Sequence, residues 1–229
     1  MSQDLIKNYL ELNLLFEKNN HSLFLVGGTV RDYLLGLPLT DMDVVTEATP
    51  DEIKEFLPEA NFVFAKYGSV SYKDSDGVKF DITTLRKENS YEDSRHPGKI
   101  EFVKDLYVDV LRRDFTINGL YMDKDLKIID YVKGQKDLKN HLLRVIGKPE
   151  NRLKEDPLRI IRALRFAIDF DLTIEEELDK AIRANINLLE NLNIEKIKQD
   201  IKKIRCSDKV KIHTYFEKYN IQSYVDAIE

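Results

Sequence analysis

The stretch LFLVGGTVRDYLLGLPLTDMDVV, residues 23–45, constrains the fold more than any other part of this sequence. It begins with an apolar strand pattern over 22–26, turns at Gly27-Gly28, and continues as a helical pattern over 29–35 that ends at Gly36. A second apolar strand follows over 41–45. Two strands joined through a glycine turn and a short helix predict a mixed α/β unit.

The rest of the sequence divides in two by its hydrophobic period. Before residue 148 we expect helices over 4–18 and 50–56, a hairpin of strands 69–73 and 78–84 around an Asp-Gly turn, and strands over 100–103 and 127–130. The polar stretch 86–99 lacks periodicity and is expected to form a loop. Beyond residue 148 the spacing is helical. We therefore predict an α/β head with a small mixed sheet over 1–148, and an all-α domain over 149–229.

Asp41 and Asp43 form the most informative chemical pattern. Side chains alternate along a strand, so both carboxylates project from one face while Met42 points the other way. Two nearby carboxylates repel each other unless a cation lies between them, and without His or Cys nearby the favoured cation is Mg²⁺. Asp41 and Asp43 are thus candidate metal ligands and catalytic residues. A strand end with two exposed acids is the alternative.

Neighbouring residues extend this candidate site. Backbone N–H groups at Gly27 and Gly28 can approach a phosphate at the start of the helix, and Arg31 lies one turn further on. An ordinary tight turn is the alternative there. Asp81, in the second hairpin strand, offers a third catalytic carboxylate, with a strand-edge acid as its alternative. Three carboxylates on adjacent strands could hold two Mg²⁺ ions for in-line nucleotidyl transfer.

Composition narrows the class of protein. No apolar run approaches the length of a membrane span, and the acidic, amphipathic start does not resemble a secretory leader. The single cysteine, Cys206, excludes an internal disulfide, and the four scattered histidines give no zinc-binding spacing. We expect a cytoplasmic protein with no membrane partner.

Charge is distributed unevenly along the chain. The net charge of −5 does not by itself favour nucleic acid. However, residues 139–165 carry eight Lys or Arg against three acids, and residues 195–211 carry seven against three. We expect a basic surface on the C-terminal third, with ordinary solvated helix faces as the alternative.

Three long segments, taken together, resemble one known family. The segments are LVGGTVRDYLLGLPLTDMDVVTEATP (25–50), LRRDFTINGLYMD (111–123) and EDPLRIIRALRFAIDF (155–170). Their order and spacing resemble the class II tRNA nucleotidyltransferase (CCA-adding enzyme) and bacterial poly(A) polymerase family, a branch of the polymerase-β-like nucleotidyltransferases. The resemblance covers roughly residues 22–205. It implies a Mg²⁺-dependent enzyme that adds C and A to the tRNA 3′ end from CTP and ATP, without a nucleic-acid template.

The resemblance also implies roles for individual residues of the head. Gly28 and Arg31 would hold the triphosphate, while the acid pair binds Mg²⁺ and carries catalysis. Arg113 and Asp114 would contact the incoming nucleotide near its ribose. From the residues alone, Arg112 could instead serve only to pair with an acid such as Asp109.

A second group of implied roles concerns base choice. Asp156 and Arg159 would hydrogen-bond the Watson–Crick edge of CTP or ATP, with Arg162 and Arg165 supporting the site. Asp156 before a proline is also a helix-capping signature. The three arginines recur every third residue and cannot share one narrow helix face, so at least one is expected to be a structural ion-pair partner.

Length is the departure from the family pattern. Family members usually continue for well over a hundred residues into helical domains that grip tRNA. This chain is therefore either a truncated form or a short enzyme that relies on its basic helices, on a homo-oligomer or partner chain, or on a smaller RNA. Open alternatives are a poly(A) polymerase, an A-adding or CC-adding enzyme, a small-molecule nucleotidyltransferase, and a non-catalytic RNA-binding module. The stretch 86–99 resembles a family loop that favours an activity including adenosine.

Overall fold

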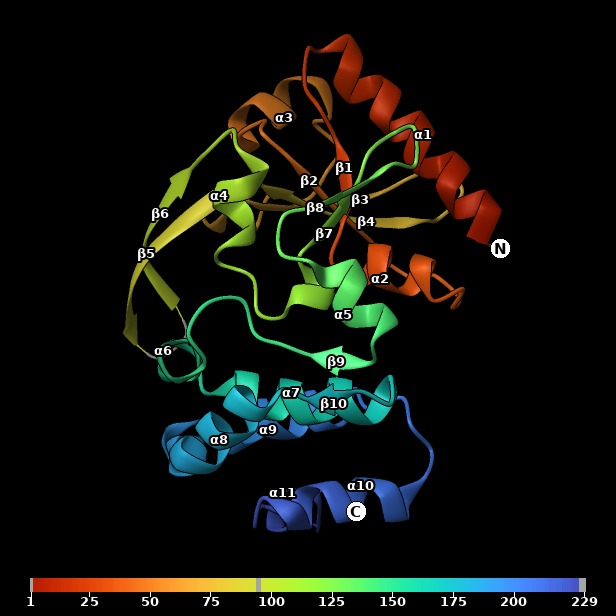
Figure 1. Ribbon diagram of the computed structural model, residues 1–229. Coiled ribbons are helices and arrows are strands. Elements are labelled where there is room, and N and C mark those ends of the chain that lie inside the picture. The colour runs from red at the N-terminus through yellow and green to blue at the C-terminus, as the bar shows by residue number, and fades with distance from the viewer. Residues whose placement is uncertain (1, 94–95, 227–229) are drawn as a thin grey trace. The chain divides into compact units, whose positions relative to one another are not determined.

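The computed structural model describes residues 2–93 and 96–226 and divides into two compact units (Figure 1). The first unit is built from Met1–Ser90, Pro97–Arg113 and Ile117–Gly134. The second contains Asp114–Thr116 and Gln135–Glu229, together with the short segment Tyr91–His96. The predicted domain boundary at residue 148 remains a prediction.

A six-stranded mixed sheet forms the centre of the first unit, in the order β3-β4-β2-β1-β7-β8. β2 runs parallel to β4, and every other neighbouring pair in this sheet is antiparallel. The mixed α/β class and the β3–β4 hairpin are confirmed. The strands are β1 (Phe24–Val26), β2 (Met42–Thr46), β3 (Ser69–Lys73), β4 (Lys79–Thr84), β7 (Leu120–Met122) and β8 (Ile128–Asp130).

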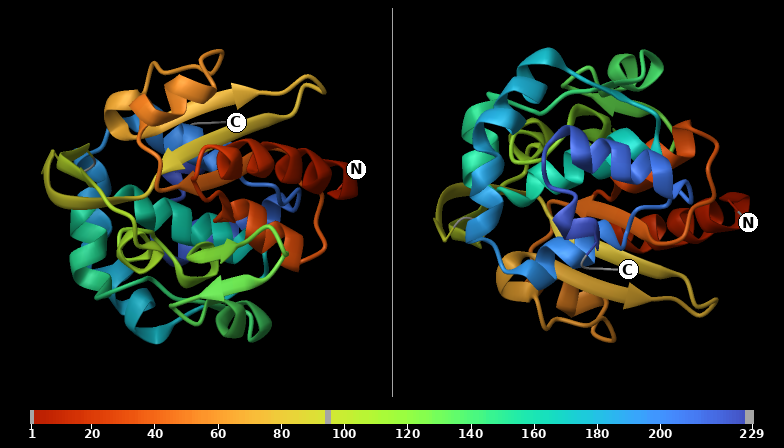
Figure 2. Two further views of the ribbon diagram at one scale, coloured as in Figure 1. Left: turned by 90° about the horizontal axis from the view of Figure 1, so that it is seen from above. Right: turned by 90° about the horizontal axis from the view of Figure 1, so that it is seen from below.

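Helix α1 (Ser2–Lys18), red in Figure 2, packs on one face of this sheet. Tyr9, Leu12 and Phe16 recur at helical spacing and are at most 6% exposed. Each such buried side chain contributes roughly 1.5–3 kcal/mol of stabilisation. The other helices of this unit are α2 (Gly28–Leu34), α3 (Pro50–Phe56), the 3₁₀ turn η1 (Ala65–Tyr67) and α4 (Leu106–Val110).

Alternation along the central strands gives the sheet an apolar face and a polar face. Met42, Val44 and Phe80 are fully buried members of the core cluster that includes α1. Asp43 and Asp81, at the intervening positions, lie opposite each other in the parallel β2–β4 register. Because side chains alternate, both acids project from the sheet face that α1 does not cover.

Helices dominate the second unit. α7 is its central element and packs against α6, α9 and α10, while α9 also contacts α11. Ile160, Ile161 and Leu164 of α7 are fully buried. Among the described residues, none of the helices is both long and apolar enough to cross a membrane. The helices are α5 (Gly134–Lys139), α6 (Pro149–Glu155), α7 (Leu158–Asp169), α8 (Glu176–Asn185), η3 (Ile186–Asn191), α9 (Ile194–Ile201), α10 (Lys209–Lys218) and α11 (Ser223–Asp226), with η2 (Thr116–Asn118) between α4 and β7.

Two expectations about secondary structure were wrong. The polar stretch 86–99 was expected to be a loop, but β5 (Arg86–Asp93) and β6 (His96–Phe102) form a two-stranded sheet. Two strands satisfy each other's backbone groups without any apolar alternation, so a polar composition hides them. Strand structure also continues past residue 148, because β10 (Thr173–Ile174) pairs in parallel with β9 (Leu142–Leu143). A strand of two residues is too short to show the alternation of apolar and polar residues by which a strand is predicted from sequence.

Candidate functional site

The acid pair lies where α2 meets β2, and Thr29 connects the two elements. Asp41 is exposed and precedes β2, whereas Asp43 is half-buried within it. Thr29 Oγ1 accepts a hydrogen bond from the Asp43 backbone N–H at 2.9 Å and lies 3.3 Å from the Asp41 carbonyl oxygen, to which it donates. This hydroxyl holds the backbone on both sides of Met42. Sequence reasoning missed Thr29, although a hydroxyl directly after a Gly-Gly turn is a signal that could have identified it.

Asp43 lies in an electrostatic environment that disfavours its charge. Burial, together with the carboxylates of Asp81 and Asp41, raises the pKa of Asp43 to about 6, against the opposing effect of Arg113 and Arg31. A carboxylate that is costly to ionise beside two other acids gains from a bound cation. The electrostatics of Asp43 therefore fit the predicted cation site.

Asp81 faces Asp43 across the sheet but also has a partner of its own. Its Oδ2 accepts a hydrogen bond from Lys79 Nζ at 2.8 Å, in a pair whose side chains are 37% and 51% exposed. Within residues 2–93 and 96–226, no three His, Cys, Asp or Glu side chains are grouped closely enough to hold a metal ion. The acid pair with added water and phosphate oxygens fits Mg²⁺ by donor type. The metal and catalytic roles of the three acids remain predictions.

Gly27 and Gly28 keep open the space beside the acids. Gly27 has φ +63°, a left-handed conformation that favours glycine. A Cβ on Gly28 would lie 3.5 Å from Arg31 Nη2 and 3.7 Å from Asp43 Oδ2. Any side chain at residue 28 would therefore project between a guanidinium and a carboxylate of the candidate site.

Arg31 is buried and oriented by two neighbours. Its Nε and Nη2 donate to Asp32 Oδ1 at 2.9 and 2.7 Å, and its Nη1 donates to Asn118 Oδ1 at 2.6 Å. The guanidinium is only 5% exposed and lies against Gly28. Arg31 therefore lies beside Gly28, as predicted, and its hydrogen bonds to Asp32 and Asn118 fix the orientation of its guanidinium. Asn118 was not singled out from the sequence.

Arg112 and Arg113 are held by one buried carboxylate. Asp109, 0% exposed, accepts from Arg112 Nε at 2.8 Å and from Arg113 Nε and Nη2 at 3.0 and 2.8 Å. The suggested Arg112–Asp109 pairing is confirmed. Arg113 Nη1 lies on the opposite side of the guanidinium, 3.7 Å from where a Cβ on Gly27 would be.

Some of these residues line a pocket of about 460 Å³ within the first unit, but Asp41, Gly28 and Arg31 are not among its lining residues. Asp43 and Asp81 contribute acidic lining, and Arg86, Arg112 and Arg113 contribute basic lining. The backbone at Gly27 and the aromatic rings of Phe64 and Tyr67 complete much of the wall. A pocket lined by both carboxylates and guanidiniums suits a ligand that carries both a cation and phosphates.

Asp114 and Arg162 pair within the second unit. Arg162 Nε donates to Asp114 Oδ2 at 2.9 Å, and Nη2 of the same arginine contacts the same oxygen. Asp114 Oδ1 accepts from the Phe115 backbone N–H at 2.7 Å. Arg162 is 31% exposed in this pair. Asp114 therefore orients Arg162, and the sugar-contact role predicted for Asp114 stays untested.

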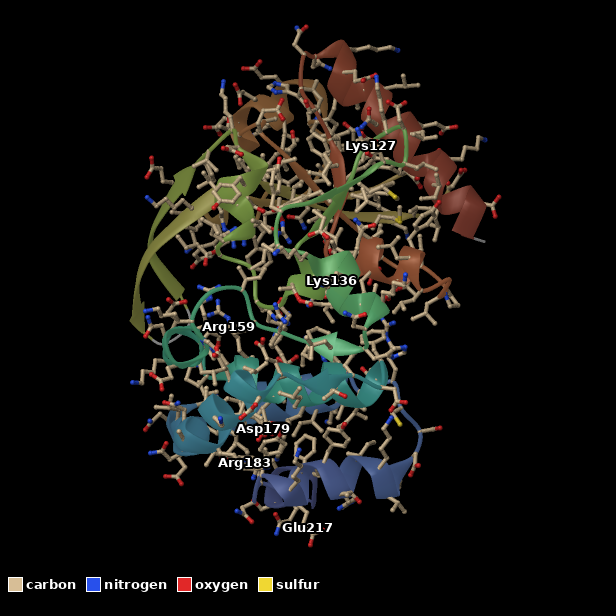
Figure 3. The ribbon with its side chains drawn as sticks, viewed as in Figure 1. Lys127, Lys136, Arg159, Asp179, Arg183 and Glu217 are labelled. Carbon is tan, nitrogen blue, oxygen red and sulfur yellow. The ribbon has the colours of Figure 1, made fainter. Side chains whose placement is uncertain are left out.

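The residues predicted to read the base lie at the junction of α6 and α7. Asp156 Oδ1 accepts from the Leu158 backbone N–H at 3.1 Å, which is the capping contact left open above. Arg159, labelled in Figure 3, donates from Nη1 to the Arg152 carbonyl at 2.7 Å and to Glu155 Oε2 at 3.1 Å. Arg159 is 6% exposed, so its guanidinium is positioned by the end of α6.

Arg165, like Arg159 and Arg162, pairs with an acid, and it fits the expectation that at least one of the three arginines is a structural ion-pair partner. Its Nη1 lies 3.1 Å from Asp200 Oδ1 in α9, and both side chains are less than 10% exposed. Burial lowers the pKa of Arg165, with Arg162 acting in the same direction. This pair ties α7 to α9, so the support that Arg165 gives to a base-reading site would be exerted through the packing of α7.

A family model, the poly(A) polymerase head domain, matches residues 23–144. The chain belongs to the poly(A) polymerase head domain family. The matched segment includes the acid pair, Gly27-Gly28, and the pocket-lining residues Arg112 and Arg113. The predicted family resemblance is confirmed.

Known members of the poly(A) polymerase head domain family resemble the chain over most of its length. A CCA-adding enzyme of Ligilactobacillus salivarius is 46% identical over 174 residues, covering 76% of this chain and 43% of the relative. One from Staphylococcus saprophyticus is 40% identical over 194 residues, covering 84% and 48%. The chain spans about half the length of the curated relatives it matches.

Solved structures give the same result for the fold. The crystal structure of the Bacillus stearothermophilus CCA-adding enzyme with CTP matches with a TM-score of 0.86 and 28% identity, covering 95% of this chain and 53% of that one. A Thermotoga maritima CCA-adding enzyme complexed with tRNA matches with a TM-score of 0.77 and 26% identity, covering 97% and 52%. The predicted nucleotidyltransferase-type fold is confirmed.

Proposed function

We propose that this chain is the nucleotidyl-transferring part of a CCA-adding enzyme, which adds C and A to the 3′ end of tRNA from CTP and ATP. The pocket lined by both Asp43 and Asp81 and by Arg112 and Arg113 carries the proposal, because it combines groups for a cation and for phosphates. The names of the relatives, which are CCA-adding enzymes, support the choice of reaction and substrates.

Asp41 and Asp43 would hold Mg²⁺, with Asp81 as a further carboxylate. Bound Mg²⁺ supplies neutralisation of the triphosphate and activation of the attacking RNA 3′-hydroxyl, with pyrophosphate as the leaving group. Thr29 holds the acid pair in place through its two backbone contacts. Arg113 would bind the nucleotide near its ribose, and Gly28 leaves room for the triphosphate beside Arg31.

Base choice would come from Asp156 and Arg159 in the second unit. A carboxylate accepts a hydrogen bond from the exocyclic amine that C and A share, and a guanidinium donates to a ring acceptor. G and U would leave these groups mispaired, which is a strong source of discrimination. Replacing Arg159 with Ala should therefore relax selection against UTP, measured as the ratio of UTP to CTP incorporation. An unchanged ratio would remove Arg159 from base reading.

Grip on the RNA is a separate requirement. The basic stretches 139–165 and 195–211 would contact the tRNA backbone, and the relatives carry roughly as much chain again beyond the matched region. A further domain, a second copy of this chain or a partner chain would supply the remaining grip. We expect the proposed activity on tRNA in the cytoplasm.

Poly(A) addition is the second candidate, favoured by the description of the matching family model. One assay separates the two: purified chain with tRNA lacking CCA, given each nucleotide separately and then CTP with ATP, with product length read on a gel. We expect extension that stops after CCA, whereas unlimited growth with ATP alone would indicate poly(A) addition.

Asp41→Ala should abolish the incorporation of every nucleotide while the variant keeps the fold. No magnesium-dependent product from the unaltered chain would contradict both activities.

A further inference from the structure

Asp109 is a fully buried carboxylate to which no role in the reaction has been given. Besides its contacts with Arg112 and Arg113, its Oδ2 accepts from the Tyr121 hydroxyl at 2.8 Å, and its Oδ1 accepts from the Arg86 backbone N–H at 3.2 Å. Two carboxylate oxygens offer about four lone-pair sites, so these donors use the full acceptor capacity of the group. The carboxylate therefore holds its partners in one arrangement.

The local backbone explains how one acid reaches both arginines. Asp109 lies in α4, and the chain continues with helical hydrogen bonds from the Arg112 and Arg113 backbone N–H groups to the Asp109 and Val110 carbonyls. Residues at i, i+3 and i+4 share one side of such a turn. Both guanidiniums therefore reach back to the same carboxylate.

The charges favour this arrangement strongly. Although burial opposes ionisation, the Arg113 and Arg112 guanidiniums and the Tyr121 hydroxyl hold the pKa of Asp109 well below its usual range. Glu88 adds a second acid to the cluster, with Arg86 Nε at 3.0 Å and Arg112 Nη1 at 3.5 Å from its Oε1. Three arginines against two acids leave an excess positive charge on this wall of the pocket.

We propose that Asp109 is a positioning residue that fixes the Arg113 guanidinium, and with it Arg112, at the wall of the 460 Å³ pocket so that Arg113 meets the incoming nucleotide. Asp109 binds the Nε and Nη2 edge of Arg113, which leaves the Nη1 side toward Gly27. Fixing a long side chain before the ligand arrives removes the cost of ordering it on binding. This role rests on the proposed nucleotide pocket.

Asp109→Asn tests the role without changing the side chain's size. An amide has one acceptor oxygen and places an NH₂ group against a second donor, so one of the two guanidiniums loses its partner. We expect Asp109→Asn to weaken binding of CTP with Mg²⁺, measured by titration calorimetry, by about tenfold or more. In the incorporation assay KM for CTP should rise more than kcat falls.

A double-mutant cycle shows whether Asp109 acts through Arg113. If it does, Asp109→Asn combined with Arg113→Ala should bind CTP within about twofold of Arg113→Ala alone. If the fold-loss of CTP affinity in the double variant equals the product of the losses in the two single variants, the proposal is overturned. The matched control is Asp137→Asn, which alters a 2% exposed carboxylate of the second unit bonded to Thr116. It should leave CTP affinity unchanged.

A second variant keeps the test decisive if Asp109→Asn does not fold. Tyr121→Phe removes one hydrogen bond to Asp109 Oδ2 and the contact at 3.2 Å with Arg113 Nε, but retains the carboxylate. We expect a smaller loss of affinity, about two- to fivefold. If the unaltered chain binds CTP and both variants bind it with the same affinity, the positioning role alone is overturned. No binding by the unaltered chain would overturn the proposed pocket and this role with it.

Discussion

Asp43 is the residue whose electrostatics report most directly on the candidate site. Its pKa of about 6 lies above the ordinary value of 3.8, so its ionisation destabilises the folded chain as the pH rises from 4 through 6. Asp43→Asn removes that cost. Without Mg²⁺ the variant should be more stable than the unaltered chain by roughly 1–3 kcal/mol above pH 7, with the difference vanishing near pH 4. Urea unfolding in the presence of EDTA at several pH values measures this.

Magnesium should reverse the order of stability. Millimolar Mg²⁺ would stabilise the unaltered chain and have little effect on Asp43→Asn, because binding to the folded state adds to its stability. The matched control, Asp125→Asn, replaces an exposed acid in the turn before β8 and should behave as the unaltered chain does. If Asp43→Asn is less stable than the unaltered chain at pH 7.5 without metal, the raised pKa assigned to Asp43 is contradicted.

Sequence predicts those site residues whose placement follows from local geometry. The face from which Asp43 projects follows from strand alternation, and the Gly27 turn follows from its position between strand and helix. Asp41 lies before β2, so its predicted shared face with Asp43 stays a prediction. Asn118 was not predicted, because its contact with Arg31 joins residues 87 positions apart. The Lys79–Asp81 pair lay within reach of prediction, since two residues apart on a strand place both side chains on one face.

At the scale of elements, the junction between α2 and β2 depends on the Thr29 hydroxyl. Thr29→Val keeps the shape of the side chain and removes its bonds to the backbone of Asp43 and Asp41. The Asp43 backbone N–H then lacks a partner, which costs about 1–3 kcal/mol. We expect the rate of nucleotide incorporation to fall by about tenfold, since the acid pair loses its support.

Thr214→Val is the matched control for that measurement. Thr214 Oγ1 donates to the Val210 carbonyl at 2.8 Å on an exposed side of α10, and the Thr214 hydroxyl has no proposed role in the reaction. Its incorporation rate should equal that of the unaltered chain. An equal rate for Thr29→Val as well would show that the junction does not support the acids.

Elements differ in how far sequence could predict them. α1 was predicted because its apolar residues recur at helical spacing over a long stretch. β5 and the first part of β6 were missed because their residues are polar, whereas the end of β6 overlaps the strand predicted over 100–103. β9 and β10 were missed because each has two residues. The full order of strands in the sheet was not predicted, because the place of β7 beside β1 depends on contacts between residues far apart in the sequence.

At the scale of the whole molecule, each of the two units contains a different part of the proposed site. The first contains the acid pair, the arginine wall and the pocket, and the second contains Asp156 and Arg159. Chemistry and base choice would therefore reside in different parts of one chain. The chain spans about half the length of the curated relatives it matches.

A crystal structure of this chain with CTP and Mg²⁺ tests the central claim most directly. We predict electron density for the triphosphate beside Gly28 and Arg113, with a cation between the carboxylates of Asp41 and Asp43. The contrary result would be a nucleotide bound elsewhere, with those two carboxylates facing solvent or paired with lysines such as Lys79.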